Sequence, residues 1–229
     1  MVKIQIIERL FYYINAYFYL ALPLGYLLLR AKKGNTAILA AYGVTCCFFL
    51  NIYSLLSEPL VDIYLFCYTY IEYLFFTVLI ASNIRNRRVI YFIVVASALF
   101  LVFQVISYQH SNLLRLDTMS IGIETILLFI YIILIFSEYL KHSKSTYIYS
   151  APFFWLALGI LIYLGGTFFF NILANHMSNR ELVQYLKLTY VLEMIKTILF
   201  LVALRIYSVR YKSSSNHNST IPYLDFDMN

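Results

Sequence analysis

The stretch LTYVLEMIKTILFLVAL, residues 188–204, decides the fold class because it is long and apolar enough to cross a bilayer, yet it carries a lysine near its middle. Lys196 lies nine residues from each of the flanking charges Lys187 and Arg205. At 1.5 Å per residue this is roughly 13 Å, close to the midplane of a hydrocarbon core about 30 Å thick. An ammonium group there costs at least about 2.5–3.5 kcal/mol, so a partner or a function is expected to account for it.

The composition of the whole chain is that of a membrane protein. Of its 229 residues, 62% are hydrophobic and 12% are charged, whereas about one quarter of a soluble domain is charged. The formal net charge of +6 arises in short loops between apolar runs, without a continuous basic face, so nucleic acid is not an expected partner. Cys46, Cys47 and Cys67 fall within apolar runs without metal-ligand spacing, which favours a packing role.

Charged residues separate seven apolar runs, each of which we expect to form a membrane-spanning helix. The expected spans are residues 10–29, 36–56, 63–84, 89–107, 120–137, 152–174 and 188–207. The sequence therefore predicts an all-α integral membrane protein, a seven-transmembrane-helix bundle over residues 1–210. Residues 211–229 are polar and small and are predicted to be a short disordered cytoplasmic tail. Pro23 is expected to kink the first helix.

The charges in the connecting loops predict the orientation. Basic residues accumulate in alternate connections, near residues 30–33, 85–88 and 141–144 and again in the tail after residue 210. The other connections carry Glu58 and Asp62, then Arg115 and Asp117, then Arg180, Glu181 and Lys187. By the positive-inside rule, we expect a multi-pass protein of the cell inner membrane with its C-terminus in the cytoplasm and its N-terminus outside.

Glu72 is the deepest carboxylate of the predicted spans. It lies ten residues from Asp62, or roughly 15 Å, and so shares the level of Lys196. This depth predicts an ion pair between the third and seventh helices. The rival partner of Lys196 is Glu193, three residues earlier on its own helix. In that alternative, Glu72 is protonated or bonded to a tyrosine such as Tyr68.

Further polar side chains fall mostly in the outer half of the spans. Because unsatisfied polar groups cost several kcal/mol in lipid, such side chains turn towards protein or water. Their common depth predicts a polar pocket that opens to the outside. The candidate residues for this pocket, or for a switch within it, are Glu72, Lys196, Glu193, Asn51, Tyr68, Gln104, Glu124 and Asn171. The aromatic residues around Glu72, Tyr163 among them, are better explained by packing.

Catalysis has little support from the sequence. The chain has no GxSxG, HExxH or Walker-type motif, and its four histidines fall in loops or the tail. We predict no cofactor or metal. The preferred interpretation is a receptor-like or accessory signalling subunit that contacts membrane lipids and binds a small ligand, a lipid or a signalling partner in the membrane or cytoplasm. The alternatives are a small transporter, a membrane-embedded lipid enzyme that uses carboxylates, and a retinal-binding protein.

The mid-membrane lysine of the seventh helix and the carboxylate of the third resemble the architecture of rhodopsins. This resemblance implies that Lys196 would form a Schiff base with retinal, with Glu72 as counterion. The residue patterns depart from those of microbial rhodopsins, because Leu192 stands where they have an aspartate and Thr69 where they have an arginine.

Three segments are similar to uncharacterised small seven-helix membrane proteins of Bacteroidota, which are often encoded beside sensor kinases. The segments are YTYIEYLFF around Glu72, FFWLALGILIYLGGTFFF in the sixth span and LEMIKTILFLVAL in the seventh. The resemblance implies a seven-helix fold and a signalling context, without a mechanism.

Overall fold

The computed structural model describes residues 12–29, 34–53, 56, 58–110, 118–142, 148–173 and 179–217. Over these residues the chain forms helices and no strand. A helical segment at residues 12–18 comes first. The elements that follow are α2 (Ala21–Leu28), α3 (Asn35–Tyr53), α4 (Glu58–Ala81), α5 (Arg87–His110), α6 (Thr118–His142), the short 3₁₀ helix η1 (Ile148–Ser150), α7 (Pro152–Leu173) and α8 (Asn179–His217).

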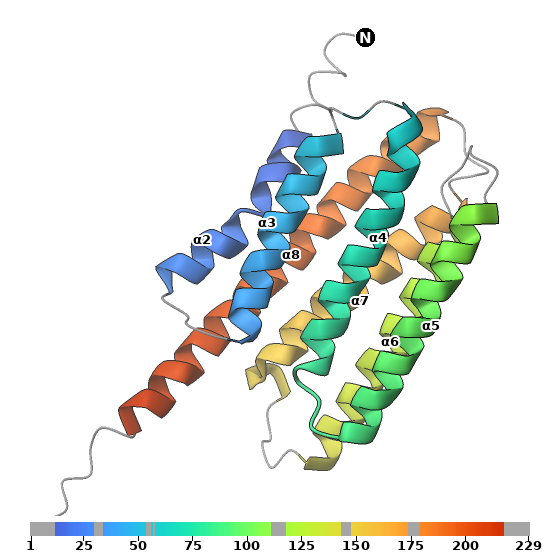
Figure 1. The fold of residues 1–229 in the computed structure, drawn as a ribbon. Coiled ribbons are helices and arrows are strands. Elements are labelled where there is room, and N and C mark those ends of the chain that lie inside the picture. The colour runs from blue at the N-terminus through green and yellow to red at the C-terminus, as the bar shows by residue number, and fades with distance from the viewer. Residues whose placement is uncertain are drawn as a thin grey trace, which may run out of the picture.

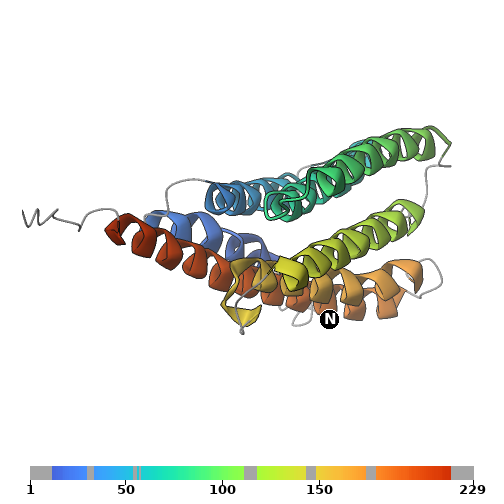
Figure 2. The same cartoon turned by 90° about the horizontal axis from the view of Figure 1, so that it is seen from below.

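The long helices run side by side in one bundle (Figure 1). From α2 to α8 each long helix packs against the next along the chain, and α8 also packs against α2, so the bundle closes on itself. In the view from below, α3, α4 and α5 form one layer, while α2, α8, α7 and α6 form the other (Figure 2). Contacts of α3 with α8 and of α4 with α7 join the two layers.

Five helical segments are long and apolar enough to cross a membrane, within the part of the chain that the structure describes. They are Asn35–Tyr53, Ile63–Ala81, Arg87–Ser107, Met119–Lys141 and Pro152–Phe170. These segments correspond to the second to sixth predicted spans, and they support a multi-pass membrane protein. The seventh predicted span lies within α8, where Glu193 and Lys196 interrupt its apolar sequence.

The first predicted span, residues 10–29, is not a single helix. The helical segment 12–18 ends in a turn at Tyr19, and α2 follows. Pro23 explains the break, because it has no N–H to donate to the Tyr19 carbonyl four residues before it. That carbonyl instead accepts the backbone N–H of Leu22 at 3.2 Å. The kink expected from Pro23 is therefore a break in the helix at Tyr19.

The third helix passes very close to this break. A Cβ atom built on Gly43 of α3 would lie 2.6 Å from the Tyr19 carbonyl oxygen and 2.9 Å from Cδ of Pro23. Only a residue without a side chain permits this approach. Gly43 therefore fixes how closely α3 and the broken first helix pack.

The last helix is longer than the seventh predicted span at both ends. It continues to His217, so residues 211–217, which were predicted to begin a disordered tail, are helical. The rest of the predicted tail, residues 218–229, lies outside the described residues. The C-terminal part of α8 projects beyond the other helices of the bundle (Figure 1).

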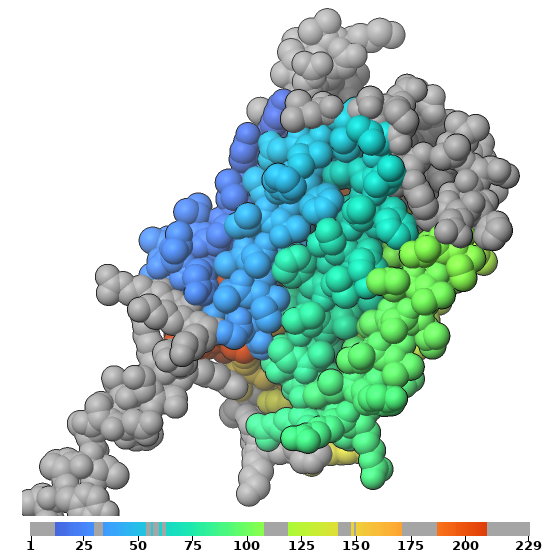
Figure 3. Space-filling view, viewed as in Figure 1, coloured from blue at the N-terminus to red at the C-terminus, as the bar shows by residue number. Residues whose placement is uncertain are grey.

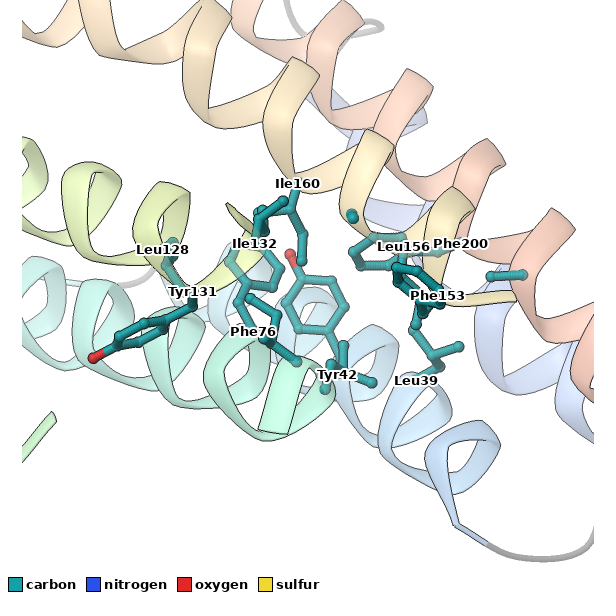
Figure 4. Close-up of a cluster of buried hydrophobic side chains, with 14 of the residues drawn as sticks. Leu39, Tyr42, Phe76, Leu128, Tyr131, Ile132, Phe153, Leu156, Ile160 and Phe200 are labelled. Carbon is teal, nitrogen blue, oxygen red and sulfur yellow. The ribbon is translucent and has the colours of Figure 1, made fainter. Parts of the chain in front are cut away.

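The core lies between the two layers and is rich in aromatic rings. Tyr42, Phe76 and Phe200 meet there, from α3, α4 and α8, beside Leu156 and Ile160 of α7 (Figure 4). In lipid, such close packing is a main source of helix association, because apolar burial offers little additional driving force.

The outer surface is strongly apolar along α5. On one face of the molecule α5 lies beside α4, and α3 lies on the other side of α4 (Figure 3). The side chains of α5 include Tyr91, which is 73% exposed, and Leu99, which is 66% exposed. An apolar exterior around a polar interior is the arrangement that a bilayer requires.

Candidate functional site

Glu72 of α4 and Lys196 of α8 form an ion pair inside the bundle. The Lys196 Nζ lies 2.9 Å from the Glu72 Oε1. Lys196 is fully buried and Glu72 is 7% exposed. The interhelical contact predicted from depth is therefore confirmed, and Lys196 pairs with Glu72 rather than with Glu193.

Two tyrosines complete the surroundings of the Glu72 carboxylate. The hydroxyl of Tyr42 donates to Oε1 at 2.8 Å, and the hydroxyl of Tyr163 donates to Oε2 at 3.1 Å. Hydrogen bonds to a charged acceptor are stronger than neutral ones. Through these bonds and the Lys196 ammonium, the helices α3, α4, α7 and α8 all meet at one carboxylate.

Aromatic rings enclose the ammonium group of Lys196. Its Nζ lies 3.4 Å from the ring centroid of Tyr163, 5.3 Å from that of Phe76, 5.4 Å from that of Tyr42 and 5.6 Å from that of Tyr19. A cation within about 6 Å of an aromatic face is attracted to it by roughly 0.5–2 kcal/mol, with the larger values at desolvated sites. We call Glu72 together with these four aromatic residues the ammonium cage.

The spacing of residues along α4 explains its part in the cage. Glu72 and Phe76 are four residues apart and therefore lie on the same face of the helix. Tyr73 points to a different neighbour, since its hydroxyl lies 2.8 Å from Ser97 Oγ of α5 and 3.0 Å from the Tyr131 hydroxyl of α6. The helix α4 thus places Glu72 in the cage and directs Tyr73 to a separate polar contact with α5 and α6.

A second polar contact lies one turn before Lys196 on α8. The Asn15 Nδ2 in the first helix donates a hydrogen bond to the Glu193 Oε2. Asn15 is 1% exposed and Glu193 is 7% exposed. The helix α8 therefore presents Glu193 to the first helix and Lys196 to α4. Tyr19 lies at the break of the first helix, and its buried hydroxyl has no hydrogen-bond partner among the described residues.

Tyr68 lies beside the cage, but the tyrosine hydroxyls that donate to Glu72 are those of Tyr42 and Tyr163. The Tyr68 ring stacks on that of Tyr64, with the centroids 6.2 Å apart and the planes at 14°. Tyr68 also lines a small pocket that Glu72, Tyr42, Phe49 and Phe75 share. The pocket has room for about one water molecule. The larger pocket that opens to the outside stays a prediction.

The other candidates are not gathered at the cage by any described contact. Asn51 is exposed on α3 and its Nδ2 donates to the Cys47 carbonyl of the same helix at 2.7 Å. Gln104 and Glu124 are buried on α5 and α6, and the Gln104 Oε1 has no hydrogen-bond partner in the described part of the chain. Asn171 falls in α7, but its side chain lies outside the description.

The sequence interpretation missed Asn15, Tyr19, Tyr42 and Phe76. Asn15 could have been found, because it is the polar side chain within the apolar run YYINAYFYLAL and must turn towards protein. The three aromatic residues give no such signal, since many tyrosines and phenylalanines occupy these helices.

The site shows no metal chemistry within the described residues, where no three His, Cys, Asp or Glu side chains come close enough to hold an ion. The Lys196 side chain fills the cage, so retinal on this lysine would require the cage to open.

Comparisons of the chain with protein-family models, with curated proteins and with solved structures find no match.

Proposed function

We propose that the chain is a receptor-like or accessory subunit of the cell inner membrane. A small ligand, a lipid or a neighbouring membrane protein would act on it by changing the contact between Glu72 and Lys196. The observation that carries this proposal is the ion pair itself, because both of its charges are buried and four helices contact it.

The energetics of buried charges support a role beyond stability. A buried ion pair is often no more stable than apolar residues of the same volume, whereas removal of one partner costs about 3–5 kcal/mol. We therefore expect the pair to contribute little net stability, although loss of one partner would strongly raise the energy of the bundle. A ligand that interacts differently with the paired and the separated state would shift the population between them.

The long last helix offers a route from the cage to the cytoplasmic side. From Lys196 to His217 it continues for 21 residues, or about 32 Å. On the way, the Tyr207 hydroxyl accepts a hydrogen bond from Asn35 Nδ2 at 2.9 Å and donates one to Asn83 Oδ1 at 2.8 Å. A shift of α8 would therefore reach the start of α3 and the turn after α4.

The topology that we propose has seven spans, with the N-terminus outside. In a cysteine-free background, Arg87→Cys and Asp117→Cys place one thiol at the start of α5, on the side expected inside, and one in a connection expected outside. A membrane-impermeant maleimide added to intact cells should label only the cysteine at position 117. Labelling of position 87 from outside, with position 117 protected, would reverse the orientation.

Spin labels test directly whether the contact between Glu72 and Lys196 acts as a switch that controls the position of α8. Arg88 of α5 and Arg205 of α8 are exposed and can be replaced by labelled cysteines in the cysteine-free protein, reconstituted in lipid nanodiscs. Glu72→Gln should shift or broaden the distance distribution between the two labels, because it releases α8 from α4. The matched control is Thr125→Val, which alters a buried side chain of α6 whose hydroxyl donates to the Ile121 carbonyl of the same helix, and which should leave the distribution unchanged. An unchanged distribution in folded Glu72→Gln protein would remove the switch.

A further inference from the structure

We propose that the ammonium cage is a binding site for a small organic ammonium ligand, and that Lys196 occupies it as a tethered substitute for this ligand. The inference rests on the proposed receptor-like function and names the chemical class that the receptor would recognise. In the ligand-bound state, Lys196 would turn to Glu193 and the ligand would pair with Glu72.

The chemistry of the cage supports this ligand class. A carboxylate surrounded by aromatic faces is the combination by which proteins recognise alkylammonium groups. Here the carboxylate is Glu72, and the rings have their centroids 3.4–5.6 Å from the ammonium nitrogen. Lys196 itself demonstrates that the cage holds a primary ammonium.

The small pocket between α3 and α4 provides a place where the ligand would approach. It shares Glu72 and Tyr42 with the cage, and its further aromatic walls are Phe49, Tyr68 and Phe75. These two helices lie side by side on the face seen in Figure 3. Because the pocket has room for about one water molecule, a larger cation fits only when the Lys196 side chain leaves the cage.

The balance of buried charge also favours a cation. Within the described residues, Glu72 and Glu193 are buried carboxylates, and Lys196 is the buried cation beside them. With both carboxylates ionised, this group is one positive charge short, and a bound ammonium would supply it. Glu193 lies three residues before Lys196 on the same helix, within reach of its side chain. The Tyr19 hydroxyl, which has no partner among the described residues, would accept a hydrogen bond from the displaced ammonium.

Chemical rescue of a vacated cage tests the site. Lys196→Ala removes a group of the size of n-propylammonium and leaves the Glu72 carboxylate in place. The full-length variant, purified in detergent, should gain thermal stability with increasing n-propylammonium chloride, measured against sodium chloride at the same ionic strength. The gain should be largest for propylammonium in a series from methylammonium to hexylammonium, and the neutral analogue n-propanol should have no such effect. The wild type should respond less, because Lys196 competes for the cage.

Two control variants separate recognition from cavity filling. Glu72→Gln/Lys196→Ala keeps the cavity but lacks the carboxylate, and it should lose the response to propylammonium. Leu128→Ala creates a cavity in the core on α6, where the fully buried Leu128 lies, and it should not respond either. An equal response in Lys196→Ala and in the double variant would overturn the inference.

A second variant keeps the test decisive if Lys196→Ala does not fold. Lys196→Val fills the base of the cage but vacates the space of the ammonium group beside Glu72, so methylammonium should stabilise it, whereas tetraethylammonium should not. Absence of an ammonium-specific response in this variant would refute the ligand class. If the spin-label distances still shift in Glu72→Gln, the proposed switch stands and only the ligand class fails. An ammonium response without a shift in the spin-label distances would support the ligand site and remove the proposed switch.

Discussion

Replacing Lys196 with methionine is expected to lower the free energy of unfolding by about 3–5 kcal/mol, because the Glu72 carboxylate then stays buried without its cation. Glu72→Gln should lower it by a comparable amount, since it leaves the fully buried ammonium without a counterion. The double variant Glu72→Gln/Lys196→Met carries neither charge and should recover much of the loss. We expect a coupling free energy of about 2–3 kcal/mol, measured by reversible denaturation in detergent micelles.

The control for this cycle combines Lys196→Met with Ser208→Ala. Ser208 lies on the same helix, twelve residues further on, or about 18 Å away. It is buried and donates to the Leu29 carbonyl at 3.2 Å, so its replacement has an effect of its own. The effects of this second pair should simply add. Additive losses for Glu72 and Lys196 would show that the two charges do not depend on each other, and would remove the switch that we propose.

Replacing Gly43 with alanine is expected to cost about 1–3 kcal/mol or more, because the added methyl group has no space. It would meet the Tyr19 carbonyl oxygen at 2.6 Å and the Cβ of Leu22 and Cδ of Pro23 at 2.9 Å. These atoms belong to the backbone or lie next to it, so the first helix has to move as a whole. The movement would displace both Tyr19 and Tyr42 from Lys196. Thermal unfolding of the purified variant measures the cost.

Alanine substitutions at two other glycines serve as comparisons for this prediction. At Gly122 of α6 an added Cβ meets no atom within 4 Å, so alanine should be neutral or stabilise the helix by up to about 1 kcal/mol. At Gly166 of α7 the nearest atoms belong to the end of the Leu192 side chain, which can rotate away, and the expected effect is intermediate. A Gly43→Ala variant as stable as Gly122→Ala would contradict the close packing of α3 on the first helix.

The ion pair could be predicted from the sequence because depth is readable in a membrane protein. A charge in the middle of an apolar run must be near the midplane, and two opposite charges at one depth are natural partners. The sequence could not decide between Glu72 and Glu193 for Lys196, because that choice depends on how α8 is rotated. Residues three apart differ by about 60° around a helix, and the packing of α8 turns Glu193 to the first helix and Lys196 to α4.

The features that the sequence did not predict depend on how the helices pack or lie in polar segments without a distinctive pattern. The turn at Tyr19 follows from Pro23, but its position beside Gly43 is a property of the packing. The continuation of α8 to His217 could not be predicted from an apolar pattern, because residues 208–217 are mostly polar. The aromatic walls of the cage are hidden among many similar residues.

The contact between Asn15 and Glu193 can form only after the last helix has been synthesised. Its two residues are 178 positions apart, one in the first helix and one in the last. The ribosome therefore delivers Asn15 to the bilayer long before its acceptor exists, and Glu72 likewise waits for Lys196. A chain that lacks α8 therefore holds Asn15 and Glu72 without their native partners, and unsatisfied polar groups in lipid cost several kcal/mol. Completion of the last helix satisfies both contacts at once.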